Sequence, residues 1–174
     1  MNMDDKTRLM PERFHMGTNL STTMSHAIGQ WQRATENPDQ ENPHNGSTIM
    51  GFVLPHWQRD SVWSEAQMVS FLESAWRGVP LGTYSYNRCD LGLALDNLLI
   101  DGQQRMIALQ RYLEDGFAVF GHRWSEVTVL DRRAFEYSTS FPCYETQSTD
   151  EQWLRDYYNR MNFGGTAHKK EERA

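Results

Sequence analysis

A run of polar residues interrupts the most apolar part of this chain. Residues 98–100 are Leu-Leu-Ile, residues 101–105 are Asp-Gly-Gln-Gln-Arg, and apolar residues then recur at helical spacing as far as Leu113. The pattern predicts a buried strand, a tight turn and the start of a helix. Gly102 would let a ligand approach the backbone, and Arg105 could bind a phosphate through two N–H groups. Because the first N–H groups of a helix have no partner within it, the turn indicates an anion site.

The same turn also has a purely structural interpretation. Asp101 could cap the helix by accepting a hydrogen bond from a first-turn N–H group, with the Gln and Arg side chains solvated on the exposed face. In the functional interpretation, Asp101 positions water, a hydroxyl or Mg²⁺, and Arg105 stabilises the charge of a transferred phosphoryl group. Periodicity alone favours neither interpretation.

A second polar cluster follows another apolar run. Residues 49–54 predict a buried strand, and Gln58 and Arg59 come shortly after it. An amide and a guanidinium in this position could bind a base or a phosphate. Alternatively, Arg59 pairs with an acid such as Asp60 or Asp101 and only fixes the loop.

The third candidate follows a helix predicted over residues 151–161. Its residues are Asn162, Gly164, Gly165, Thr166 and His168. Two adjacent glycines permit a tight anion-binding loop, in which Thr166 could supply a hydroxyl and His168 could act as a general base. The glycine pair is also consistent with a simple helix C-cap.

Composition and missing motifs exclude several classes of protein. The chain has 17 Lys and Arg against 23 Asp and Glu, so it lacks the overall basic field of a non-specific DNA-binding protein. Cys89 and Cys143 have no zinc-ligand spacing, which favours a reducing compartment. The P-loop and serine-hydrolase motifs are missing. Without an apolar run of about 20 residues or a signal peptide, we expect a cytoplasmic protein with no membrane partner.

The elements around these clusters mix helices and strands. We predict helices over 20–34 with Ser21 as N-cap, from Ser64 to 77 with a Ser64–Gln67 capping box, from the 101–105 turn to 114, and over 151–161. We predict strands over 49–54, 83–86, 94–100, 117–120 and 126–130, and an exposed loop over 35–48. The order predicts a mixed α/β (α+β) fold in a single compact domain. Residues 1–48 would form a helical N-terminal extension, made of an arm, a helix and a flexible loop, and residues 49–174 the core.

Taken in order, the three clusters resemble one family. The segment from Pro55 to Trp63 has the pattern P-x-x-QR-x-x-x-W, residues 101–105 are DGQQR, and residues 162–166 have the pattern N-x-G-G-T. The chain thus resembles, over about residues 20–172, the ParB/sulfiredoxin-like domains that include the N-terminal domain of GmrSD-type modification-dependent restriction enzymes. Compact relatives occur in phages.

The resemblance implies a ParB/sulfiredoxin-like domain that binds a nucleotide. The ligand would be an NTP (ATP, GTP or CTP) with Mg²⁺, and the reaction would be NTP hydrolysis or transfer of the γ-phosphate in DNA modification, restriction or phage–host conflict. The resemblance implies that Asp101, Gln104 and Arg105 form the phosphate and catalytic cluster. With His168 as the candidate base, we expect Asp101, Arg105 and His168 to be catalytic, and Asp101 could bind Mg²⁺. The implied phosphate-binding residues are Gln58, Arg59, Gly102, Gln103, Gln104, Arg105, Asn162, Gly164, Gly165 and Thr166.

Two other functions remain open at this point. One is a non-catalytic nucleotide- or DNA-binding regulatory module, and the other is a small ParB-like nuclease. Larger relatives append a helical or nuclease domain that this sequence lacks, so we do not expect cleavage by an HNH-type module. Candidate partners are the nucleotide, DNA and a DNA-modification or restriction protein, and the chain could form an oligomer. All these interpretations require the three clusters to converge on one ligand.

Overall fold

The strands and helices of this chain are short and alternate along it. The computed structural model describes residues 8–42, 44–58, 60–90 and 92–163. The helices are α1 (Met24–Glu36), α2 (Pro38–Glu41), α3 (Glu65–Trp76), α4 (Gln103–Leu113), α5 (Val129–Ser138) and α6 (Glu151–Phe163), with a 3-10 turn, η2 (Trp124–Glu126). The strands are β1 (Thr18–Leu20), β2 (Thr48–Ile49), β3 (Phe52–Val53), β4 (Tyr84–Asn87), β5 (Leu98–Asp101) and β6 (Cys143–Thr146). The predicted mixed α+β fold in one compact domain is confirmed.

One six-stranded sheet joins all the strands in the order β1-β6-β4-β5-β3-β2. Strand β5 lies inside the sheet, antiparallel to β4 and parallel to β3. Strand β6 runs parallel to β4 and antiparallel to the edge strand β1. Because β5 has a strand on each side, the turn that leads from it into α4 starts from a well-supported position.

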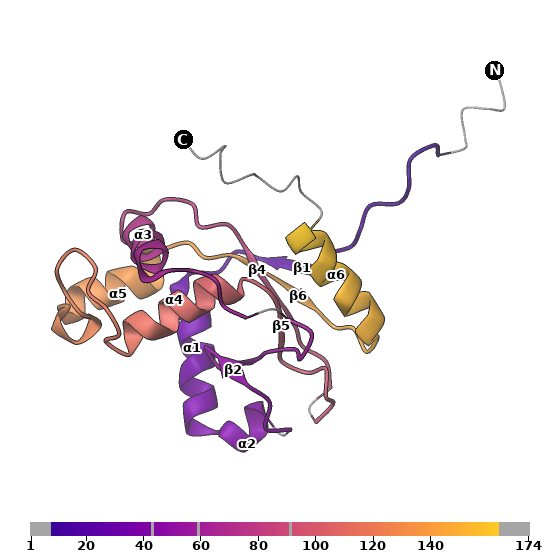
Figure 1. Ribbon diagram of the computed structural model, residues 1–174, viewed down its shortest axis with the longest axis horizontal. Coiled ribbons are helices and arrows are strands. Elements are labelled where there is room, and N and C mark those ends of the chain that lie inside the picture. The colour runs from indigo at the N-terminus through magenta and orange to yellow at the C-terminus, as the bar shows by residue number, and fades with distance from the viewer. Residues whose placement is uncertain (1–7, 43, 59, 91, 164–174) are drawn as a thin grey trace.

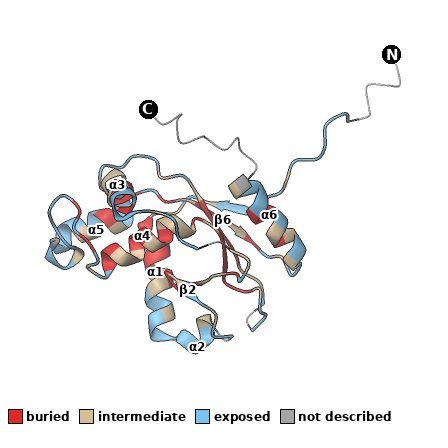
Figure 2. Cartoon of the chain, in the orientation of Figure 1, coloured by how far each residue is buried: buried red, intermediate tan, exposed pale blue. Residues whose placement is uncertain are grey.

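The two faces of the sheet are covered by different helices. Alternate residues of β5 point to opposite faces, as the pleat of a strand requires. Leu99 packs in the main core with buried side chains of α1, α3, α4 and α5, whereas Leu98 and Ile100 pack against Leu154 and Tyr157 of α6. Figure 1 shows α6 on the other side of the strands from α3, α4 and α5, and Figure 2 shows buried residues along α4 and the central strands.

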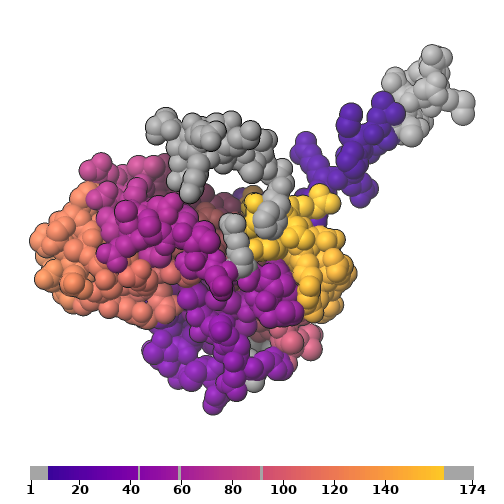
Figure 3. All heavy atoms as spheres, in the orientation of Figure 1, coloured from indigo at the N-terminus to yellow at the C-terminus, as the bar shows by residue number. Residues whose placement is uncertain are grey.

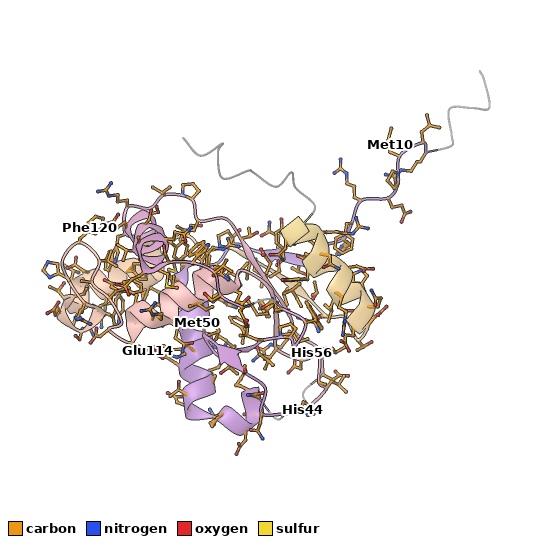
Figure 4. The ribbon with its side chains drawn as sticks, viewed as in Figure 1. Met10, His44, Met50, His56, Glu114 and Phe120 are labelled. Carbon is orange, nitrogen blue, oxygen red and sulfur yellow. The ribbon has the colours of Figure 1, made fainter. Side chains whose placement is uncertain are left out.

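The segment after β3 reaches α6, which brings two of the predicted clusters to the same side of the sheet. The ring of Trp57 packs edge-on against the ring of Tyr158, with centroids 5.2 Å apart. His56 Nε2 lies 3.2 Å from a guanidinium nitrogen of Arg155. Figure 3 shows this segment against α6, and Figure 4 shows His56 on that side of the molecule.

All four helices predicted from periodicity are present, as α1, α3, α4 and α6. Helix α3 has the predicted capping box, in which Ser64 Oγ accepts from the N–H of Gln67 and Gln67 Oε1 accepts from the N–H of Ser64. Helix α1 begins later than predicted, with Thr23 rather than Ser21 at the N-cap. The loop predicted over 35–48 contains the short helix α2, which has Pro38 in its first turn. Proline is tolerated there because its missing N–H would have no partner within the helix.

The strand predictions need several corrections. Residues 49–54 form a hairpin, β2 and β3, rather than one strand; Met50 and Gly51 at its turn have φ of 51° and 77°. Met50 lies beside α4, where its N–H donates to Gln110 Oε1 at 2.7 Å (Figure 4). Residues 117–120 form no strand beyond one bridge between Val119 and His122. Residues 126–130 enter helix α5, because Thr128 accepts from the N–H of Asp131 and caps it.

The N-terminal region contributes side chains to the core. Met24, Ala27 and Ile28 of α1 are buried in the same cluster as α3 and α4. Strand β1 pairs with β6, and neither strand was predicted. Among the described residues, no helix combines the length and the apolar character that crossing a membrane requires.

The capping box yields a test of helix α3. Replacing Ser64 with Ala should lower the free energy of unfolding by about 1 kcal/mol, because the N–H of Gln67 loses its acceptor. Denaturant unfolding would measure the change. Ser70→Ala is the matched control, since Ser70 is exposed on the same helix and its side chain makes no hydrogen bond to a described residue. Equal effects of the two substitutions would contradict the capping role.

Candidate functional site

A polar cavity of about 160 Å³ lies at the start of α4, where β5 ends. Four parts of the chain meet there: the segment that leads into α3, strand β5, the first turn of α4 and the C-terminal part of α6. The lining residues are Gln58, Trp63, Ile100, Asp101, Gly102, Gln103, Gln104, Arg105, Tyr158 and Asn162. Its volume is below the roughly 300–1,000 Å³ of pockets that enclose drug-sized ligands, so it can hold a small group or one end of a larger ligand.

Gly102 forms the floor of the turn between β5 and α4. Its φ is +101°, which disfavours a side chain, and a Cβ would lie 2.7 Å from Tyr84 Cβ on β4. Helix α4 therefore begins without a side-chain cap. Its first intrahelical hydrogen bond runs from the N–H of Met106 to the carbonyl of Gly102. The N–H groups of residues 103–105 precede that bond and have no acceptor within the helix.

Asp101 and Arg105 form an ion pair one helical turn apart. Arg105 Nη2 lies 3.2 Å from Asp101 Oδ2, and Arg105 Nη1 donates to the carbonyl of Leu81 at 3.0 Å. Burial raises the pKa of the Asp101 carboxyl above its ordinary value of 3.8, and the Arg105 charge and the Gly102 N–H offset only part of this. Burial likewise lowers the pKa of the Arg105 guanidinium. The pair thus occupies a weakly solvated position, where a change in either charge has a strong effect.

Gln104 connects α4 to the segment before α3. Its Oε1 accepts from Ser61 Oγ at 3.0 Å and from the N–H groups of Val62 and Trp63 at 3.1 Å each. A single amide oxygen therefore fixes three consecutive residues. Through Trp63, which lines the cavity and packs on Phe71, this contact also positions one wall of the site.

Gln58 connects the second predicted cluster to the end of β5. Its Nε2 donates to the carbonyls of Leu99 and Ile100, at 2.9 and 3.2 Å. Its Oε1 is buried and has no donor among the described residues. Since buried polar atoms in proteins are usually hydrogen-bonded, this oxygen needs an explanation.

Amides and aromatic rings make up the rest of the wall. Gln103 and Asn162 line the cavity from α4 and α6, and Asn162 Nδ2 donates to the carbonyl of Tyr158 at 2.9 Å. The described lining holds one carboxylate and one guanidinium, Asp101 and Arg105, which neutralise each other. The backbone N–H groups of α4 therefore supply the positive end of a dipole without a compensating acid in the first turn of the helix.

The structure brings together parts of all three predicted clusters. The predicted site residues at the cavity are Gln58, Asp101, Gly102, Gln103, Gln104, Arg105 and Asn162. Arg59, Gly164, Gly165, Thr166 and His168 lie outside the described residues. The purely structural alternative for the turn is wrong in two respects: Gly102 rather than Asp101 is the N-cap, and Gln104 and Arg105 bind backbone groups instead of being solvated.

Sequence reasoning missed one aromatic wall of the cavity. Tyr158 lies in the helix predicted over residues 151–161, but it was not predicted as a site residue. It precedes Asn162 by four residues, and residues at that spacing lie on the same face of a helix. This spacing was the signal that could have placed Tyr158 beside the predicted Asn162.

The described residues offer little for a metal ion by themselves. No group of three or more His, Cys, Asp or Glu side chains lies close enough to hold one in the part of the chain that the structure describes. Asp101 supplies a single carboxylate at the cavity. Such a site fits Mg²⁺ only if a substrate contributes phosphate oxygens, which is the usual way in which Mg²⁺ is held in nucleotide sites.

Comparison with known proteins identifies the family of this chain. The family model described as the GmrSD restriction endonuclease N-terminal domain matches residues 41–133, more than half of the chain. The matched region contains β2 to β5, α3 and α4, and with them every described lining residue of the cavity except Tyr158 and Asn162. No curated protein and no solved structure matches the chain.

Because Gln104 anchors the segment before α3, replacing it should loosen that segment. Gln104→Ala should lower the free energy of unfolding by about 1–3 kcal/mol and speed hydrogen exchange at the Val62 and Trp63 amides, which lose their acceptor. Gln104→Glu retains the accepting oxygen and is the matched control. Amide exchange measured by NMR would compare the two variants. Unchanged exchange at both amides in Gln104→Ala would show that this oxygen does not hold the segment.

Proposed function

This chain belongs to the family of GmrSD restriction endonuclease N-terminal domains, and from that membership we propose that it acts in the restriction of modified or foreign DNA. We propose that it does so by binding a nucleoside triphosphate at the start of α4 and hydrolysing it or transferring its γ-phosphate. The observation that carries the proposal is the convergence of Gln58, the β5–α4 turn and Asn162 on one cavity. These residues come from segments far apart in the sequence, and each was predicted to contact the same ligand.

The phosphates would lie at the N-terminus of α4. The N–H groups of residues 103–105 have no intrahelical acceptor, and Gly102 has no side chain that could fill the space in front of them. The helix dipole adds partial positive charge at the same point. Arg105 uses two of its five N–H donors on Asp101 and Leu81, which leaves donors for phosphate oxygens without breaking either contact.

Asp101 is the group that would accept a proton. Burial raises its pKa, which makes the carboxylate a better base than an ordinary aspartate. It would take the proton from an attacking water or hydroxyl, and Arg105 would stabilise the charge on the transferred phosphoryl group. Alternatively, Asp101 would act not as the base but as the protein ligand of a Mg²⁺ ion that neutralises phosphate charge when bound with the nucleotide.

A non-catalytic role has its own support in the structure. Gln104 and Arg105 adjoin the cavity and also anchor residues 61–63 and Leu81. A ligand that competes for these donors and acceptors would shift both segments. The same pocket could therefore act as a nucleotide-dependent switch for a partner without turning the nucleotide over.

Gln103 allows phosphate binding to be tested separately from folding. Gln103→Glu adds a carboxylate in the first turn of α4, where it favours the helix dipole but repels phosphate. We therefore expect unchanged or higher thermal stability together with nucleotide affinity that falls about tenfold or more. Gln32→Glu, at an exposed position of α1, adds the same charge away from the cavity. Calorimetric titration of the four NTPs with Mg²⁺ would measure the affinities, and equal effects of the two variants would argue against phosphate at α4.

Asp101→Asn distinguishes turnover from binding. The amide keeps the shape of the carboxylate but is not a base, so NTP binding should persist while phosphate release falls at least about 100-fold. In the wild type, the rate should fall as the pH is lowered through the pKa of Asp101, at a pH above the ordinary 3.8, because protonation removes the base. Phosphate release from ATP, GTP, CTP and UTP, with and without DNA, would provide the measurement. If the wild type binds an NTP but releases no phosphate, the switch rather than the enzyme is supported.

A further inference from the structure

The side-chain amide of Gln58 indicates which part of the ligand lies next to β5. This inference rests on the proposed function. The side-chain amide has a fixed orientation. Nε2 donates to two carbonyls, those of Leu99 and Ile100. Rotating the amide by half a turn would place Oε1 against both carbonyl oxygens, which repel it. Oε1 is therefore a hydrogen-bond acceptor in a set position.

That acceptor has no donor among the described residues, although it is buried. A buried polar atom without a partner costs about 1–3 kcal/mol, and a ligand that supplies the partner recovers this energy. Asp101, at the end of the strand whose carbonyls Gln58 contacts, adds a carboxylate to this part of the lining. The lining at the end of β5 thus contains acceptors, of which Gln58 Oε1 lies beneath the cavity surface, whereas the start of α4 supplies N–H donors.

A bare phosphate chain matches only one of these two sides. Ionised phosphate oxygens accept hydrogen bonds and suit the start of α4, but they offer no donor to Gln58. A sugar hydroxyl or a base N–H has the missing donor. We propose that Gln58 is a specificity-determining residue whose Oε1 accepts a hydrogen bond from an O–H or N–H of the nucleoside part of the ligand.

The wild-type protein tests this with matched ligands. Calorimetry would compare inorganic triphosphate, which has no nucleoside, with the four NTPs and with their 2′-deoxy and 3′-deoxy analogues, all with Mg²⁺. At least one NTP should bind about 5- to 150-fold more tightly than triphosphate. Loss of this gain in a deoxy analogue would identify a sugar hydroxyl as the donor. Retention of the gain in both analogues, together with differences among the four bases, would identify a base N–H.

A variant separates recognition from support of β5. In Gln58→Met, which keeps the length of the side chain, the advantage of NTP over triphosphate should disappear, so that the two ligands bind with equal affinity. If Gln58 only supports β5, both ligands should weaken together. Gln32→Met on α1 is the matched control and should leave both affinities unchanged. Should Gln58→Met fail to fold, the wild-type ligand series alone decides the question.

The outcomes also separate this inference from the proposed function. Triphosphate that binds as tightly as every NTP would overturn the role of Gln58 and leave the phosphate site standing. Equal loss of both ligands in a folded Gln58→Met would likewise overturn that role. If neither triphosphate nor any NTP binds the wild type, the proposed function fails, and the role of Gln58 fails with it.

Discussion

The close contact between Gly102 and Tyr84 is the constraint on which the rest of the site depends. Strand β5 can turn into α4 beside β4 only because residue 102 has no Cβ, which would lie 2.7 Å from that of Tyr84. Strand β5 is the inner strand that joins the main core on one face to the packing of α6 on the other. The direction of α4, the open N–H groups at its start and the distance to α6 all follow from this junction.

The polar residues around that junction have two roles at once. Gln104 holds the segment before α3, Arg105 holds Leu81, and Gln58 holds the end of β5. These contacts connect loops that would otherwise meet the core only through apolar packing. A ligand in the cavity would touch the same side chains that fix its walls, which links binding to loop position in either form of the proposed function.

Local signals predicted the elements that depend on few long-range contacts. The Ser64–Gln67 capping box, the apolar periodicity of α4 and the Leu-Leu-Ile run of β5 were all correct, because neighbouring residues determine each of them. The strand prediction for residues 126–130 was wrong because alternating apolar residues are typical of a strand. In the structure Val129 and Leu130 are 68% and 78% exposed, and the Thr128–Asp131 cap starts a helix there. Strands β1 and β6 were missed because they are short and their positions depend on pairing with each other and with β4.

The sequence by itself determined the turn at residues 101–105, the helix that follows it and the order of the three polar clusters, since short-range spacing and backbone preference are enough for these. Only the tertiary structure decided that Gln58 and Asn162 meet the start of α4, because the pairing of β3 with β5 and the packing of α6 bring them together. It also decided that Asp101 and Arg105 neutralise each other and that Gln58 Oε1 has a set position with no donor among the described residues. The partners of a polar side chain depend on which distant backbone groups lie within about 3 Å, and no local pattern encodes that distance.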